Sequence, residues 1–97
     1  MQKMTTFFTR VDQIRFEDCD AAGIAFYPRL ALIVNRTVED WFADSLGMSF
    51  AKMHVQARAG VPAVRLAIDY LRPFNLGDVV HCELGVNKLG TSSVTLG

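Results

Sequence analysis

The chain has 97 residues, of which 51% are hydrophobic, and its ten basic and ten acidic residues cancel to a formal net charge of zero. This length corresponds to one small domain, and the balanced charge provides no field that would hold a nucleic-acid backbone. The hydrophobic fraction exceeds the usual range of about 45–50%. Because a domain of this size buries only a thin core, we expect part of the apolar surface to be buried between subunits.

The sequence shows no signal for a membrane or an oxidising compartment. The apolar runs at residues 21–26 and 30–34 fall far short of the ~20 residues that a membrane helix requires. Residues 1–6 lack the long apolar run of a signal peptide. Cys19 and Cys82 have no metal-type spacing, so they indicate free thiols in a reducing compartment. We expect a cytoplasmic protein without metal, membrane or nucleic-acid partners.

The N-terminal half predicts a strand, a turn and one long helix. Apolar and polar residues alternate imperfectly in residues 7–16, which predicts a strand and allows a bulge within it. A turn of small residues follows and ends at Gly23, whose backbone is permissive. Pro28 suits the first position of a helix, because the N–H that it lacks would be unpaired there anyway.

Residues 28–46 predict the helix at the centre of the domain. Its apolar face is marked by residues at three- and four-residue spacing: Leu30, Ile33, Val34, Val38, Trp41 and Phe42. Gly47 is expected to end the helix in the left-handed conformation. About eighteen residues span roughly 27 Å, which is enough to cross a small sheet.

The C-terminal half predicts antiparallel strands. Residues 48–60 form a short helical or irregular segment, and an alternating strand pattern occupies residues 64–71. A turn at residues 72–78 separates it from a strand at 79–89, and a third strand begins at 92–96. The order of strand, long helix and strands predicts an α+β fold. Because a sheet that stops at Gly97 would leave a bare edge, we expect either a truncated chain or a second subunit that completes the sheet.

Three acidic residues, Glu17, Asp18 and Asp20, stand just before the predicted helix start. A carboxylate there can act as nucleophile or general base, and the unpaired N–H groups of the helix start can hold a developing oxyanion. This pairing suits acyl transfer. Aspartate is also a usual cap of turns and helices, so composition and spacing alone leave both interpretations open.

The helix-entry stretch resembles the signature of the 4-hydroxybenzoyl-CoA thioesterase family, a branch of the hotdog-fold acyl-CoA thioesterases. It reads Asp18-Cys19-Asp20-Ala21-Ala22-Gly23-Ile24-Ala25-Phe26-Tyr27-Pro28, and a looser match runs through the helix into the turn at 72–78. The resemblance implies a hotdog fold, an antiparallel sheet wrapped around one long helix, with residues 1–97 as a single domain that lacks the last strands. It also implies a homodimer or homotetramer with active sites at the dimer interface.

The resemblance also implies site residues. Asp20 is the catalytic carboxylate, and the backbone N–H of Tyr27 polarises the thioester carbonyl. Gly23, Phe26 and Asn35 fall at substrate-binding positions; Asn35 replaces an acidic residue that meets a ring hydroxyl in the family, so the acyl group stays open. The predicted function is hydrolysis of an acyl- or aroyl-CoA thioester to the free acid and coenzyme A. No cofactor is implied, since coenzyme A is part of the substrate.

Two other functions fit the same fold. A hotdog module could bind an acyl thioester without cleaving it. A hotdog dehydratase or hydratase would need a histidine on or near the central helix, and residues 28–46 contain none.

Other residues give weaker candidates. His54 has no nucleophile in a recognisable motif, and His81 and Cys82 are strand neighbours whose side chains should point apart. The carboxylates beside Cys19 should raise the pKa of its thiol and make it inert. Three basic residues could hold the phosphates of coenzyme A, or simply form a solvated face: Arg65, Arg72 and Lys88.

Overall fold

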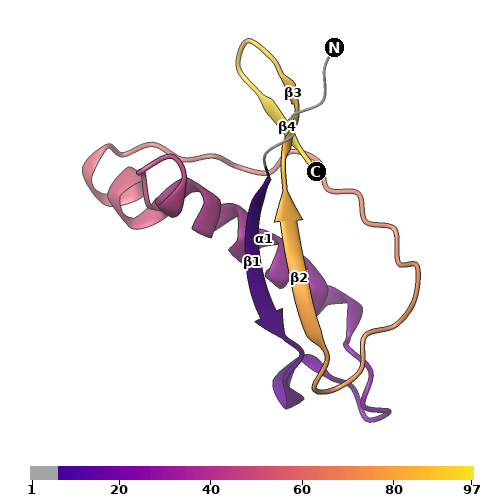
Figure 1. Ribbon diagram of the computed structural model, residues 1–97. Coiled ribbons are helices and arrows are strands. Elements are labelled where there is room, and N and C mark those ends of the chain that lie inside the picture. The colour runs from indigo at the N-terminus through magenta and orange to yellow at the C-terminus, as the bar shows by residue number, and fades with distance from the viewer. Residues whose placement is uncertain (1–6) are drawn as a thin grey trace.

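The computed structural model describes residues 7–97, so the prediction about a signal peptide in residues 1–6 lies outside the described residues. Along the chain the elements are β1 (Phe8–Gln13), the 3-10 turn η1 (Phe16–Asp18), α1 (Tyr27–Asp44), the π-helical turn η2 (Lys52–Gln56), β2 (Val79–Leu84), β3 (Val86–Leu89) and β4 (Val94–Leu96). Figure 1 shows α1 crossing one face of the β1–β2 pair, while β3 and β4 form a hairpin beyond the end of β2.

The β1–β2 pair is antiparallel and continuous, with Phe8 opposite Leu84 and Gln13 opposite Val79. The strand predicted in residues 7–16 is therefore confirmed, but no bulge interrupts it. A shift of register occurs instead between Val86 and Lys88, where β3 pairs with β4. Alternate residues of β1 and β2 are shielded on the side that α1 covers, and the others are exposed.

Helix α1 agrees with the predicted range to within two residues. Ile33 and Thr37 are its buried residues, whereas Val34, which was expected on the apolar face, is exposed. The helix face that packs on the sheet is thus narrower than predicted. Gly47 ends the helix with φ +67°, and the Met48 N–H donates to the Phe42 carbonyl at 3.0 Å, as the sequence predicted.

The core lies where α1, the sheet and the segment before α1 meet. Ile14, Ala25 and Ile33 are buried together, and five partly buried side chains pack around them: Cys19, Leu30, Phe74, Val80 and Cys82. Because Ala25 is part of this cluster, the start of α1 and the acidic segment before it are anchored to the sheet.

The strand predicted at residues 64–71 is wrong. Residues 57–74 contain no strand and run as a long extended connection (Figure 1). The alternating side chains are present, but a strand also needs a neighbour for its backbone, and no described segment pairs with this one. Val64 and Leu71 are consequently 92% and 93% exposed.

The other C-terminal predictions hold with one change. The helical segment within 48–60 and the turn at 72–78 are confirmed, the latter with Gly77 at φ +91°. The strand predicted at 79–89 is divided at Gly85, whose N–H and carbonyl pair with Gly97 at 2.7 and 3.0 Å. No helix within residues 7–97 is both long and apolar enough to cross a membrane.

Candidate active site

The acidic segment folds into a short hairpin, residues 18–26, which we call the acidic hairpin. Cys19 pairs with Ala25 across it, and the Phe26 N–H donates to the Asp18 carbonyl at 2.7 Å. Because Phe26 is the cap residue of α1, the hairpin delivers the chain directly into the helix.

Asp20 lies at the tip of this hairpin with its carboxylate held by the turn. Oδ1 accepts the Ala22 N–H at 2.9 Å and the Ile24 N–H at 3.4 Å. The Asp20 backbone closes the loop, since its N–H donates to the Ile24 carbonyl at 3.0 Å and its carbonyl accepts the Gly23 N–H at 3.1 Å. The residue is exposed, and Oδ2 has no hydrogen bond within residues 7–97. One oxygen therefore orients the group while the other stays open to a ligand.

Gly23 completes the loop in the left-handed conformation, with φ +75°. A Cβ there would meet no atom within 4 Å, so the backbone conformation, rather than space, favours glycine. The second arm of the hairpin is hydrogen-bonded to the turn at 72–78: Leu76 N–H donates to the Gly23 carbonyl at 3.0 Å, and Ala25 N–H donates to the Phe74 carbonyl at 2.8 Å. The two segments that carry the family resemblance are thus in direct contact.

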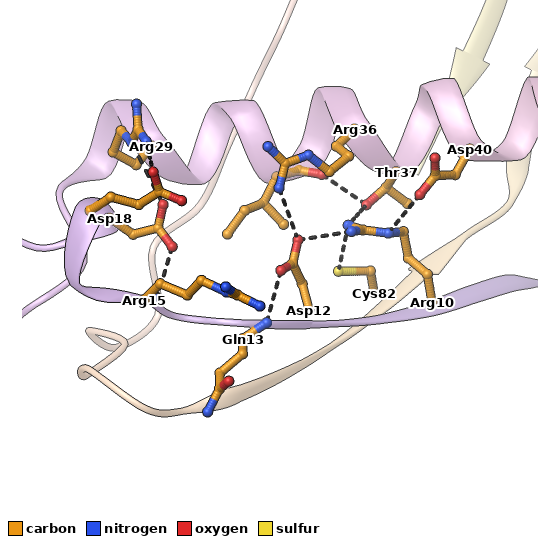
Figure 2. Close-up of polar contacts among 12 residues, drawn as sticks. Arg10, Asp12, Gln13, Arg15, Asp18, Arg29, Arg36, Thr37, Asp40 and Cys82 are labelled. Carbon is orange, nitrogen blue, oxygen red and sulfur yellow. Dashed lines mark hydrogen bonds and ion pairs between the residues drawn. The ribbon is translucent and has the colours of Figure 1, made fainter.

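The Asp18 carboxylate makes contacts that stabilise the turn. Its Oδ2 accepts the Arg15 N–H at 3.0 Å, and its Oδ1 lies 3.6 Å from Arg29 Nε (Figure 2). Glu17 lies 3.8 Å from the same guanidinium and is largely exposed. Asp18 therefore shapes the turn, and Glu17 is a solvated charge.

Tyr27 is the first residue of α1, and its N–H has no acceptor within residues 7–97. The first N–H groups of a helix have no intrahelical partner and carry the positive end of the helix dipole. Ile24, opposite Asp20, precedes Tyr27 by only three residues. The hairpin therefore presents a carboxylate and an open N–H on the same short stretch of chain.

The remaining predicted binding residues, Phe26 and Asn35, lie on either side of the start of α1. Phe26 is 47% exposed and its ring contacts that of Tyr27, with centroids 5.4 Å apart. Asn35 is exposed on α1, eight residues after Tyr27 and hence about 12 Å farther along the axis. Asp20, Gly23 and Phe26 thus belong to one hairpin at the helix start, and Asn35 lies apart from them within one chain.

Sequence reasoning missed Tyr70 at this place. Its hydroxyl donates to the Tyr27 carbonyl at 3.4 Å, across 43 residues of sequence, and the two rings meet edge to face at 6.5 Å. Nothing in the alternating pattern around Tyr70 pointed to the helix start, because the pattern predicted a paired strand.

A comparison with known protein families identifies the family of this chain. Residues 42–97, more than half of the chain, match the family model of the Thioesterase superfamily. The chain belongs to this superfamily.

Two curated relatives of this thioesterase-superfamily chain share a name. It is 36% identical over 84 residues to a 1,4-dihydroxy-2-naphthoyl-CoA hydrolase of Synechococcus elongatus, covering 86% of this chain and 60% of the relative. It is 28% identical over 83 residues to the protein of that name from Nostoc punctiforme, covering 86% and 55%. The chain therefore spans less than two thirds of the length of these relatives.

Two solved structures show the fold of the superfamily in this chain. A thioesterase superfamily protein from Jannaschia sp. CCS1 superimposes with a TM-score of 0.86 at 23% identity, over 99% of this chain and 67% of the other. A probable thioesterase from Bartonella henselae gives 0.78 at 12% identity, over 94% and 85%. The predicted α+β hotdog fold is confirmed.

A polar network fastens α1 of this superfamily member to the sheet. The Arg10 guanidinium, which reaches from β1 to α1, has four contacts (Figure 2). They are Asp12 at 2.8 Å, Asp40 at 3.0 Å, the Thr37 hydroxyl at 3.1 Å and the Cys82 sulfur at 3.9 Å. The Thr37 hydroxyl in turn donates to the Ile33 carbonyl, which explains how a polar residue is buried on the inner face of the helix.

Asp12 is the more buried of the two carboxylates in this network. Partial burial acts to raise its pKa, but the Gln13 N–H, the Arg10 guanidinium and the charge of Arg36 outweigh burial and hold the pKa below its ordinary value. The carboxylate therefore stays ionised, and it pairs with Arg10 along β1 and with Arg36 of α1 at 3.7 Å.

The sequence also singled out both cysteines and both histidines. The pKa of the Cys19 thiol is raised by its partly buried position and by the carboxylates of Asp18 and Asp20, which makes it a poor nucleophile. Cys82 lies on the α1 side of β2 and His81 on the exposed side, so they form no dyad. His54 donates from Nδ1 to the Phe50 carbonyl at 2.8 Å. Within residues 7–97, no three His, Cys, Asp or Glu side chains are grouped as a metal site requires.

Proposed function

We propose that this protein is an acyl-CoA thioesterase that hydrolyses an acyl- or aroyl-CoA thioester to the free acid and coenzyme A. The observation that carries the proposal is the Asp20 carboxylate, oriented through Oδ1 and open at Oδ2, on a hairpin that leads into an open helix start. Membership of the thioesterase superfamily supports the same chemistry.

Asp20 and Tyr27 have complementary roles in this proposal. The Asp20 carboxylate either attacks the thioester carbonyl carbon or takes a proton from a water that attacks it. In both routes the carbonyl oxygen becomes an oxyanion, which the Tyr27 N–H stabilises with the helix dipole behind it. The carbon–sulfur bond then breaks and coenzyme A leaves as the thiolate. In the first route the thiolate takes a proton from solvent, and water afterwards hydrolyses the acyl-aspartate anhydride; in the second route the thiolate can take the proton that Asp20 accepted from water.

The substrate class that we favour is an aromatic acyl-CoA. The relatives are named for hydrolysis of 1,4-dihydroxy-2-naphthoyl-CoA. Phe26 offers an exposed ring beside the hairpin, and the Asn35 amide can both donate to and accept from a ring hydroxyl.

We further propose a homodimer in which residues 61–71 of two copies pair as antiparallel strands. The segment is extended, unpaired and rich in exposed apolar side chains. Its sequence is self-complementary about Ala67: an antiparallel register centred there sets Arg65 opposite Asp69 and Leu66 opposite Ile68.

The test of the function is a panel of acyl-CoA thioesters, aromatic and straight-chain, with release of free thiol as the readout. Turnover of at least one thioester, with an aromatic one preferred, is the expected result. Tight binding without release of thiol would instead identify a non-catalytic thioester-binding module. Formation or hydration of a carbon–carbon double bond would identify a dehydratase or hydratase.

A further inference from the structure

Three aromatic rings meet at the start of α1, and we call them the aromatic patch: Phe26, Tyr27 and Tyr70. The Phe26 and Tyr27 centroids lie 5.4 Å apart at 55°, and the Tyr27 and Tyr70 centroids lie 6.5 Å apart at 78°. The three residues are 47%, 65% and 50% exposed. The patch is thus a contiguous aromatic surface of which about half is open.

The tilt of the rings leaves room for another aromatic group. Aromatic pairs prefer edge-to-face or offset contacts at centroid distances of about 4.5–7 Å. Since neither pair in the patch is stacked face to face, ring faces remain available. Phe16, which is even more exposed, has no ring contact within residues 7–97 and serves as a contrast.

The patch is joined to the acidic hairpin on one side and to the helix start on the other. Phe26 N–H donates to the Asp18 carbonyl at 2.7 Å, and the Tyr70 hydroxyl donates to the Tyr27 carbonyl at 3.4 Å. The hydrogen bond of the Tyr70 hydroxyl is long and therefore weak. The aromatic ring of Tyr70 is thus more important for binding a ligand than its hydroxyl.

We propose that the aromatic patch receives the acyl group of an aromatic acyl-CoA, and that Tyr70 is a specificity-determining residue that favours aromatic over straight-chain acyl groups. The inference rests on the proposed function, since it assigns the acyl end of a thioester to a surface beside Asp20. A flat acyl ring gains ring–ring contact in addition to buried area, whereas a straight chain gains buried area alone.

The test measures binding by calorimetry in the Asp20→Asn background, with 2-naphthoyl-CoA and octanoyl-CoA as probes. Tyr70→Leu is expected to weaken the binding of 2-naphthoyl-CoA by about three- to tenfold and the binding of octanoyl-CoA by less than about twofold. Tyr70→Phe keeps the ring and should keep the preference. Phe16→Leu, the matched control, removes an exposed ring outside the patch and should change neither affinity.

Equal weakening of both thioesters by Tyr70→Leu, or an unchanged preference, would overturn the proposal. Native mass is measured for every variant, because Tyr70 also lies in the segment proposed to pair between two copies. If Tyr70→Leu changes the native mass, Phe26→Leu, which lies outside residues 61–71, decides the proposal instead, and an unchanged preference in that variant overturns it. If Tyr70→Leu does not fold, Phe26→Leu removes a ring from the other edge of the patch, and the same loss of preference is expected. A parent that binds but does not hydrolyse thioesters would contradict the proposed function alone, while the binding preference would still decide the role of the patch.

Discussion

Replacing Arg10 by alanine is expected to destabilise the fold by about 2–4 kcal/mol. The Arg10 side chain is 15% exposed, and its guanidinium binds two carboxylates and a hydroxyl, at 2.8, 3.0 and 3.1 Å. A hydrogen bond to a charged group contributes about 1.5–3 kcal/mol, and breaking a buried pair costs about 3–5 kcal/mol. We stay below the top of the combined range because Asp40 is 44% exposed and its pairing is screened by solvent.

The assay is thermal unfolding followed by circular dichroism at one fixed protein concentration, since association would shift the midpoint. For a domain of this size, 1 kcal/mol lowers the midpoint by about 4–8 °C, so Arg10→Ala should lower it by roughly 10–30 °C. Arg36→Ala is the matched control: its side chain is 61% exposed and lies 3.7 Å from Asp12, so its loss should cost less than about 1 kcal/mol. Equal effects of the two substitutions would refute the view that the Arg10 network holds α1 to the sheet.

Two further predictions concern acid stability and assembly. The pKa of Asp12 is lower in the folded chain than its ordinary value of 3.8. Its contribution to the free energy of unfolding is therefore complete well above pH 3.8 and is lost as the pH falls through the folded pKa. Urea midpoints should therefore drop below about pH 4 more steeply in the parent than in Asp12→Asn, and parallel curves would contradict this. In the dimer register, Asp69→Arg should weaken the dimer and the swap Arg65→Asp/Asp69→Arg should restore it, as judged by native mass at micromolar concentration. A swap that stays as weak as the single variant would exclude this register.

Local chemistry was predictable where it depends on neighbours in sequence. The ends of α1 follow from Pro28 and Gly47, and the loop of the acidic hairpin follows from Gly23, because each residue restricts or frees its own backbone. The direction of the Cys19 pKa shift was equally accessible, since carboxylates flank that thiol in the sequence.

Contacts between distant residues were not predictable. Thr37 is buried because Arg10, 27 residues earlier, reaches it from β1, and the helical pattern alone favoured Val34 for that face. Residues 64–71 have the side-chain alternation of a strand, yet pairing depends on a neighbour that the pattern does not specify. Tyr70 joined the candidate site only through its contact with Tyr27.

The central claim is that Asp20 performs the chemistry, and thiol release from the best thioester by Asp20→Asn tests it most directly. The substitution keeps the Oδ1 acceptor that binds the Ala22 and Ile24 N–H groups, so the hairpin should persist. We predict a fall in kcat of about 10²–10⁴-fold with thioester affinity nearly unchanged, while Glu17→Gln, a neighbouring exposed acid, retains parental turnover. An Asp20→Asn variant as active as the parent would contradict the account.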